Sequence, residues 1–298
     1  MNFLTKAVLE TDEEGTGTFD QFLDQFKLTA KLKHFICSSI IFSPPGSITC
    51  QEGVTLLRKF LKSLGRYSAC SSFLTPLYGS GELSQAFSRM SAVFGGITIL
   101  DYPPSSISIT DNRIDHMLFR DKKIAADHVI GEGAYLTETL PFDQSEFFSQ
   151  KLMILNEAVW RAAVIDTEKV IDTPNSSTDD HCILSTISNG VLIWGTSLSS
   201  SSCTVPKDHV LISLRSTNQA ELDSFVTRIP PADWSMSFDN FKLEFGSLPN
   251  NLTVSPTVSD RPGYDYAVKW ARETFQKLCP EEEWMPAMPD PADIIIES

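Results

Sequence analysis

The fold of this chain is indicated most strongly by one unbroken segment, Pro76-Leu77-Tyr78-Gly79-Ser80-Gly81-Glu82-Leu83-Ser84-Gln85-Ala86-Phe87-Ser88-Arg89-Met90-Ser91-Ala92-Val93-Phe94-Gly95-Gly96. Its proline and first glycines predict a turn, and its closing glycine pair predicts a helix that ends in a left-handed cap. Between the two turns, apolar residues recur at helical spacing. They predict a buried face made of Leu83, Ala86, Phe87, Met90, Val93 and Phe94.

A second stripe of the same helix is polar. Glu82 and Arg89 lie two helical turns apart on this stripe, with Gln85 between them. A rigid helix that shows one acid and one base outward between two glycine turns suits binding to another protein. The simpler interpretation is a solvated helix face, where an exposed charged pair contributes little to stability.

The composition and the charge restrict the kinds of partner. The chain has 298 residues and a net charge of -14, which argues against binding to nucleic acid or to anionic membrane surfaces. No apolar run is long enough for a transmembrane segment, and the N-terminus does not have the basic and apolar regions of a secretory signal. Six cysteines without paired spacing predict reduced thiols, so we expect a soluble protein of the cytosol.

Elsewhere the sequence changes from helical to strand-like patterns. Residues 18–66 carry two amphipathic helical stripes, one built on Phe19 and Leu23 and the other on Leu57 and Leu61. Beyond residue 94 the pattern is mainly that of strands and turns, with a final helix. The predicted features are a turn at Asp111-Asn112, strands at Ala158–Ile165, Cys182–Trp194 and Val210–Leu214, a serine-rich loop at Ser197–Ser202 and a helix at Tyr264–Leu278. Together these patterns predict a mixed α+β protein.

Patterns that are typical of enzymes are not completed. Gly79-x-Gly81 is followed by Ser84 where a dinucleotide-binding fingerprint has its third glycine, and no Gly-x-Ser-x-Gly motif occurs. The five histidines form no i, i+4 metal pair, and the sequence has no Cys-x-x-Cys. We therefore expect no catalytic residue, no metal and no cofactor.

The segment from Pro76 to Gly96 resembles a signature of the family of Rab GDP dissociation inhibitors and Rab escort proteins. The shared features are the Pro-Leu-Tyr-Gly turn, the Gly-Glu step before an aliphatic residue, the aromatic-x-Arg step and the closing Gly-Gly. Three other segments resemble the escort proteins in particular: Lys27–Phe35, Phe60–Tyr67 and the run from Cys279 through Trp284 to Ile296. The resemblance covers residues 18–100 and 263–296 most clearly.

The resemblance implies a fold and a division into domains. It implies a small helical domain over residues 1–70, of the type that binds the transferase and prenyl groups. Over residues 71–298 it implies part of a large flavoprotein-like mixed α/β domain that carries the Rab-binding platform. It also implies that the chain lacks the N-terminal glycine-rich unit with which family members begin.

By the same resemblance, several residues are expected to bind partners. The expected contacts with a Rab GTPase are Glu82, Arg89, Ile97, Ile99 and Tyr78. The expected contacts with the geranylgeranyl transferase are Phe60 and Arg66. Alternation alone equally allows the two isoleucines to be strand core, and Phe60 shares its stripe with core leucines. Four phenylalanines of the helical domain are either walls of a prenyl pocket or, as we favour, plain core: Phe22, Phe26, Phe35 and Phe42.

The expected function is that of a Rab escort protein-like accessory subunit, which performs no chemistry itself. Such a subunit binds a GDP-bound Rab GTPase and presents it to the Rab geranylgeranyl transferase. It then shields the prenyl lipid on the Rab until transient delivery to a membrane. One alternative is a Rab GDP dissociation inhibitor that recycles prenylated Rabs, which the proline-rich C-terminus disfavours. An alternative from another class is a flavin-dependent oxidoreductase on the same fold.

Overall fold

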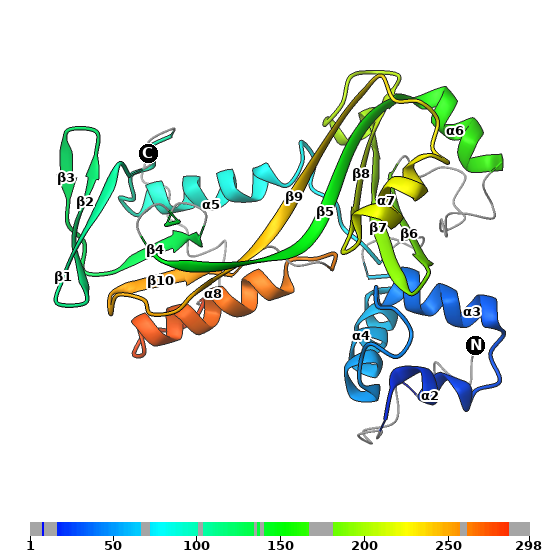
Figure 1. The fold of residues 1–298 in the computed structure, drawn as a ribbon, viewed down its shortest axis with the longest axis horizontal. Helices are drawn as coiled ribbons and strands as arrows, with labels where there is room; N and C mark the ends of the chain where they lie inside the picture. The colour runs from blue at the N-terminus through cyan, green and yellow to red at the C-terminus, as the bar shows by residue number, and fades with distance from the viewer. Residues whose placement is uncertain are drawn as a thin grey trace, which may run out of the picture. The chain divides into compact units, whose positions relative to one another are not determined.

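The computed structural model describes residue 8 and residues 17–66, 72–100, 104–133, 136–137, 140–166, 181–256 and 261–285 (Figure 1). The chain packs as two compact units. The first comprises residues 1–100 and 145–242, and the second comprises residues 101–144 and 243–298. Both contain helices and strands, so the predicted mixed α+β content is confirmed. The helical segment expected as a separate domain over residues 1–70 falls within the first unit, and its independence stays a prediction.

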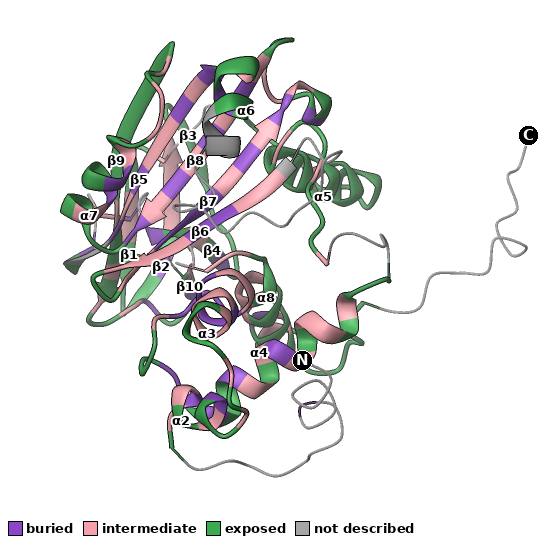
Figure 2. Ribbon diagram, turned by 90° about the vertical axis from the view of Figure 1, so that its right-hand side faces the viewer, coloured by how far each residue is buried: buried purple, intermediate pink, exposed green. Residues whose placement is uncertain are grey.

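The first unit is built on a five-stranded sheet with the strand order β6-β7-β8-β5-β9. The pairs β6-β7, β7-β8 and β8-β5 are antiparallel. Buried and half-buried residues alternate along β8, because successive side chains point to opposite faces of the sheet (Figure 2). The strands are β5 (Phe142–Asn156), β6 (His181–Ser188), β7 (Val191–Ser199), β8 (His209–Ser216) and β9 (Trp234–Phe245).

Helices α6 (Glu157–Asp166) and α7 (Gln219–Val226) pack against one face of this sheet. Trp160 from α6 meets Leu222 and Phe225 from α7 over the central strands. Removing these large apolar side chains from water is the main force that holds the layers together. The buried core consists of Met153, Leu155, Trp160, Leu184, Ile193, Val210, Ile212, Leu214, Leu222 and Phe225.

Short helical segments between residues 19 and 63 surround a second core. Thr18, Thr29 and Thr49 cap three of them, because each threonine side chain accepts a hydrogen bond from a backbone amide of the first turn. Phe19, Leu23 and Leu57 are buried between the segments, which confirms the helical pattern predicted over residues 18–66. The segments are α2 (Phe19–Asp24), α3 (Ala30–Phe35), the π-helix η1 (Ile36–Ile40) and α4 (Cys50–Ser63).

This helical cluster packs against the other face of the sheet. The hydroxyl oxygens of Ser39 and Ser185 are 2.9 Å apart, within hydrogen-bond distance. The ring of Phe42 meets that of Trp194 edge to face, with the centroids 6.0 Å apart. Trp194 follows the core residue Ile193 on β7, so its side chain points away from α6 and α7.

The strand predicted at Ala158–Ile165 is wrong, because these residues form helix α6. The Asn156 side chain caps the helix by accepting hydrogen bonds from the amides of Ala158 and Val159, at 3.0 and 3.3 Å. An ion pair from Arg161 to Glu157, at 2.6 Å, joins adjacent turns of the helix. The cap and this pairing outweigh the strand-like composition of the segment.

The single strand predicted at Cys182–Trp194 is two strands joined by a hairpin. The chain turns at Asn189-Gly190, where both residues have positive φ, of 49° and 78°. Two central residues with positive φ are characteristic of the type I′ turn that matches the twist of paired strands. The strand at Val210–Leu214 is confirmed as the centre of β8.

The second unit contains small sheets and one long helix. A three-stranded sheet has its first hairpin at Asp111-Asn112, both of positive φ, which confirms the predicted turn. Buried Asn251 links this sheet to the next strand: its side-chain amide donates to the carbonyl of Ile114 and accepts from its N–H, at 3.0 and 2.8 Å. The elements are β1 (Ser106–Thr110), β2 (Arg113–Phe119), β3 (Lys122–Ile124), the parallel pair β4 (Val129–Glu132) and β10 (Leu252–Ser255), and α8 (Asp265–Leu278).

Helix α8 confirms the helix predicted from Tyr264 to Leu278, with its first residue as the cap. The ring of Phe275 meets that of Trp284 edge to face, with the centroids 5.4 Å apart, so the chain folds back on the helix after it ends. Pro286 to Ile296, the rest of the escort-like C-terminal run, lies outside the described residues.

We expect Cys37 to stay an unreactive thiol while the protein is folded. Burial, together with the neighbouring Asp20 carboxylate, raises the pKa of this thiol to about 12. The thiolate is the form that reacts, so iodoacetamide at about pH 8 should spare Cys37 and modify the exposed Cys203. Because the ordinary pKa of 9.0 returns on unfolding, stability due to the buried thiol should be lost as the pH rises above that value.

Mass spectrometry of peptides from the alkylated native protein measures both cysteines in one sample. Alkylation in urea is the control, since Cys37 should then react as Cys203 does. Equal modification of the two residues in the native protein would contradict the prediction that the folded protein keeps Cys37 unreactive.

Candidate functional site

Helix α5 (Gly81–Val93) and its flanking turns correspond to the segment predicted from Pro76 to Gly96. The helix ends as predicted: Gly95 has φ 86°, its amide donates to the Ala92 carbonyl, and the amide of Gly96 donates to the Ser91 carbonyl. This pair of hydrogen bonds, 3.1 and 2.9 Å long, is a Schellman motif, which satisfies the last carbonyls of a helix.

The buried face predicted for this helix is wrong, because α5 has no buried residue among those described (Figure 2). Phe87, Val93 and Phe94 are 61%, 78% and 86% exposed. The helical period shows which residues share a side of the helix but not whether another element covers that side. In this structure the apolar stripe faces solvent, which makes it a candidate interaction surface.

Glu82 and Arg89 are both exposed on the neighbouring polar stripe, as predicted. Within the described part of the chain, neither side chain makes a hydrogen bond or an ion pair. The two charges are therefore available to a partner. Their proposed contact with a GTPase stays a prediction.

The other residues expected to contact the GTPase flank α5. Tyr78 lies in the turn before the helix and is 66% exposed, and Ile97 and Ile99 follow the closing glycines. Residues 96–99 form no strand, and the two isoleucines are 87% and 59% exposed. The alternative interpretation of Ile97 and Ile99 as strand core is therefore wrong. The structure brings all five expected residues into one exposed segment, residues 78–99.

The residues expected to bind the transferase lie at the end of α4 and just after it. Phe60 is half-buried, and its ring packs at 6.0 Å from that of Phe73. Phe73 in turn meets Phe42, at 6.1 Å, so Phe60 belongs to an aromatic row that reaches the sheet. Arg66 is exposed in the turn after the helix. The structure shows the packing of Phe60 but does not test a transferase contact.

The phenylalanines considered as prenyl-pocket walls are packed side chains. Phe42 is buried against Trp194, while Phe22 and Phe26 pack against the core of the helical cluster and against each other, at 5.0 Å. Phe35 is half-buried in α3. These contacts agree with the interpretation of the four residues as plain core.

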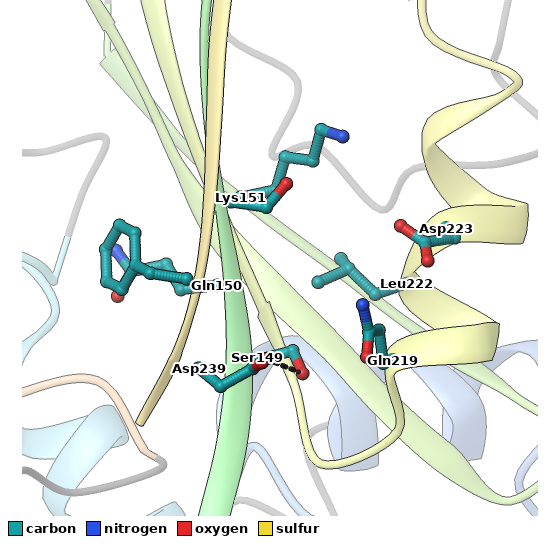
Figure 3. Close-up of a pocket in the computed structure, with 9 residues that line it drawn as sticks. Ser149, Gln150, Lys151, Gln219, Leu222, Asp223 and Asp239 are labelled. Atoms are coloured by element: carbon teal, nitrogen blue, oxygen red, sulfur yellow. Dashed lines mark hydrogen bonds between the residues drawn. The ribbon is translucent and has the colours of Figure 1, made fainter. Parts of the chain in front are cut away.

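A small cavity lies between α7 and the strands β5 and β9 (Figure 3). Lys151 and Asp223 line it, and Ser149 donates a hydrogen bond to Asp239 across the two strands, at 2.7 Å. Its volume of about 60 Å³ holds only a few water molecules, whereas ligand pockets measure about 300–1,000 Å³. We therefore assign no ligand to this cavity.

Two general properties of the described residues complete the description of the site. None of their helices is both long and apolar enough to cross a membrane. Their His, Cys, Asp and Glu side chains do not gather in groups of three that could hold a metal ion.

The sequence did not indicate what supports the turn before α5. The amide of Tyr78 donates a hydrogen bond to the carbonyl of Ser202, at 2.8 Å, in the connection between β7 and β8. Both groups belong to the backbone, so residue type carries no signal for the contact.

The fold and the site define a mixed α/β protein with a capped, solvent-exposed helix. The sequence profile of the family described as GDP dissociation inhibitor matches residues 7–180, which include α5 and both flanking turns. The chain therefore belongs to the GDP dissociation inhibitor family. This confirms the resemblance to that family and gives no support to a flavin-dependent oxidoreductase.

Several curated proteins of this family are similar to the chain. It is 28% identical to Rab proteins geranylgeranyltransferase component A 2 of Homo sapiens, over 94% of this chain and 46% of that protein. It is 29% identical to component A 1 of Rattus norvegicus, over 100% of this chain and 50% of that protein. Guanosine nucleotide diphosphate dissociation inhibitor 1 of Arabidopsis thaliana is 32% identical over 29% of this chain and 20% of its own length. The chain thus spans about half the length of the component A proteins it matches.

The fold is similar to that of a Rab GDI from Plasmodium falciparum, with a TM-score of 0.73. The comparison covers 95% of this chain and 66% of that chain, at 13% sequence identity. At this identity the likeness concerns the fold alone. It confirms the predicted fold class, a partial flavoprotein-like domain combined with helices.

Proposed function

We propose that this chain acts as a Rab escort protein-like accessory subunit without catalytic activity of its own. In this role it binds GDP-bound Rab GTPases, presents them to the Rab geranylgeranyl transferase and then shields the attached lipid. The observation that carries the proposal is the exposed α5, which offers Glu82 and Arg89 without partners in the described chain. The names of the component A relatives support the escort role.

The GTPase-binding surface in this proposal is the segment from Tyr78 to Ile99. Glu82 and Arg89 supply charges that orient a partner, and the exposed apolar residues beside them supply the area that leaves water on binding. The net charge of -14 favours approach of a partner with a basic patch.

The remaining partners are assigned to the helical cluster. Phe60, near the end of α4, and Arg66, in the turn after it, are the proposed contacts for the transferase. The cluster is also the proposed place where the prenyl lipid is held, because burial of lipid in an apolar core offsets the cost of keeping it in water. We place the chain in the cytosol, with transient delivery of its cargo to membranes.

Isothermal titration with an unprenylated, GDP-loaded Rab GTPase tests the proposal. Glu82→Ala and Arg89→Ala should each weaken binding about tenfold, because each removes one charged contact from the interface. Arg272→Ala, at an exposed position of α8, is the matched control and should bind as the unmodified chain does. Binding by the unmodified chain that neither α5 substitution alters would contradict the proposed surface.

A Rab GDP dissociation inhibitor is the second candidate. It is favoured by the similarity of part of the chain to the Arabidopsis inhibitor. An inhibitor of this kind acts on prenylated Rabs, whereas an escort protein receives them before prenylation. Titration with both forms of one Rab separates the candidates: tight binding of the unprenylated form supports the escort role, and binding of the prenylated form alone supports the inhibitor.

A further inference from the structure

The connection between β7 and β8 holds the start of α5. It contains the 3-10 helix η3 (Ser200–Ser202), and the carbonyl of Ser202 accepts the hydrogen bond from the amide of Tyr78, at 2.8 Å. The methyl group of Thr204 lies 3.5 Å from the place where a Cβ on Gly79 would stand. One residue of this connection therefore bonds to Tyr78, and another borders the space beside Gly79, just before α5.

Side-chain hydrogen bonds hold the backbone of this connection in a defined conformation. Ser202 is buried, and its hydroxyl donates to the carbonyl of Ser199 at 2.7 Å. The hydroxyl oxygen of Thr204 lies 2.5 Å from that of Ser202, which also accepts from the amide of Thr204 at 3.3 Å. Ser199 and Ser202 are buried and Thr204 is half-buried, so these hydrogen bonds hold the connection in place with the Ser202 carbonyl toward Tyr78.

Tyr78 depends on such support because its backbone is in an unfavourable conformation. It has φ 63°, and the amide of Gly79 donates to the carbonyl of Pro76, at 3.4 Å, to close the turn around it. In a type II turn this position normally requires glycine or asparagine. A bulky residue keeps such a conformation only where its surroundings impose it. The hydrogen bond from its amide to Ser202 is one of the contacts that impose this conformation.

We propose that Ser202 and Thr204 are positioning residues for α5, which set the direction in which the helix leaves the sheet. Because α5 has no buried residue among those described, the turn from Pro76 to Gly79 is where that direction is fixed. The two residues thereby orient Glu82 and Arg89 without touching the partner. This inference rests on the proposed GTPase-binding function and gives the serine-rich connection a role in it.

Two substitutions at Thr204 separate its hydroxyl from its methyl group. Thr204→Val keeps the methyl group beside Gly79 and removes the hydroxyl, whereas Thr204→Ser keeps the hydroxyl. We expect Thr204→Val to speed hydrogen exchange at the Tyr78 amide about fivefold and to weaken GTPase binding by a similar factor, which corresponds to one net hydrogen bond. Thr204→Ser should restore slow exchange and affinity. Exchange is measured by mass spectrometry on peptides covering residues 75–82, and the melting temperature confirms that each variant is folded.

The exchange measurement does not need the GTPase, so it judges the positioning role separately from the proposed function. Unchanged exchange at Tyr78 in Thr204→Val overturns the inference, as does faster exchange with unaltered affinity. If Thr204→Val fails to fold, Ser202→Ala takes its place, with the same expected result. If the unmodified chain binds no Rab GTPase, the proposed function fails, and the exchange data alone then decide whether the connection holds α5.

Discussion

Replacing Arg89 with glutamate should weaken binding to a GDP-loaded Rab GTPase by about 100-fold or more, which is larger than the effect of removing the charge. In the proposed interface Arg89 faces a negatively charged group of the partner. A glutamate in its place would repel that group, and such like-charge contacts cost several kcal/mol. The stability of the chain should not change, because Arg89 is exposed and has no partner in the described structure. Isothermal titration and a thermal melt measure the two quantities.

Arg272→Glu is the matched control for this charge reversal. Arg272 is also an exposed arginine of a helix, and its replacement changes the net charge of the protein by the same amount. Equal losses of affinity in the two variants would mean that overall charge, rather than a contact at Arg89, governs binding. Full affinity in Arg89→Glu would remove this residue from the proposed surface.

Gly195→Ala should destabilise the first unit by about 3 kcal/mol or more, which makes it the largest stability effect expected in this chain. Gly195 is buried at the centre of β7, opposite Leu184 on β6 and Leu214 on β8. A methyl group at this position would collide with the backbone carbonyl of Ser213. A backbone group cannot rotate away as a side chain does, so β7 and β8 would have to separate and lose hydrogen bonds.

Urea unfolding followed by circular dichroism measures this effect. Gly246→Ala is the control, because a Cβ added at Gly246 meets no atom within 4 Å and the residue does not have positive φ. Its unfolding midpoint should match that of the unmodified chain. A Gly195→Ala protein with an unaltered midpoint would show that the two strands can move apart without cost.

Local signals in the sequence predicted the elements that local interactions form. The Gly95-Gly96 cap, the Asp111-Asn112 turn and the helix from Tyr264 to Leu278 are formed by groups a few residues apart, and all three are present. The strand-like composition of Ala158–Ile165 is misleading, because the Asn156 side chain beside it caps a helix. The missed hairpin at Asn189-Gly190 was equally readable, since that dipeptide is a strong turn signal.

What the sequence could not provide was the environment of each element. The period of α5 grouped Phe87 with Phe94 correctly, but only the tertiary structure shows that both face solvent. Likewise, the contact of Tyr78 with Ser202 joins backbone groups from distant segments, so no pattern of side chains predicts it. Glu82 and Arg89 could be predicted as site residues because they belong to a recognisable motif. Their surroundings could not be deduced from the sequence.

The two hydrogen bonds between Asn251 and Ile114 have a consequence for producing this protein in a secretory host. Asn251-Leu252-Thr253 has the form of an acceptor for N-linked glycans. In the folded chain the amide nitrogen that would carry the sugar is buried and donates to the carbonyl of Ile114. Because Asn251 is buried, a sugar attached there during synthesis would not fit in the folded chain, so the side chain could not take its place beside Ile114. Glycan occupancy at Asn251 would therefore report the fraction of secreted chains in which the second unit did not fold.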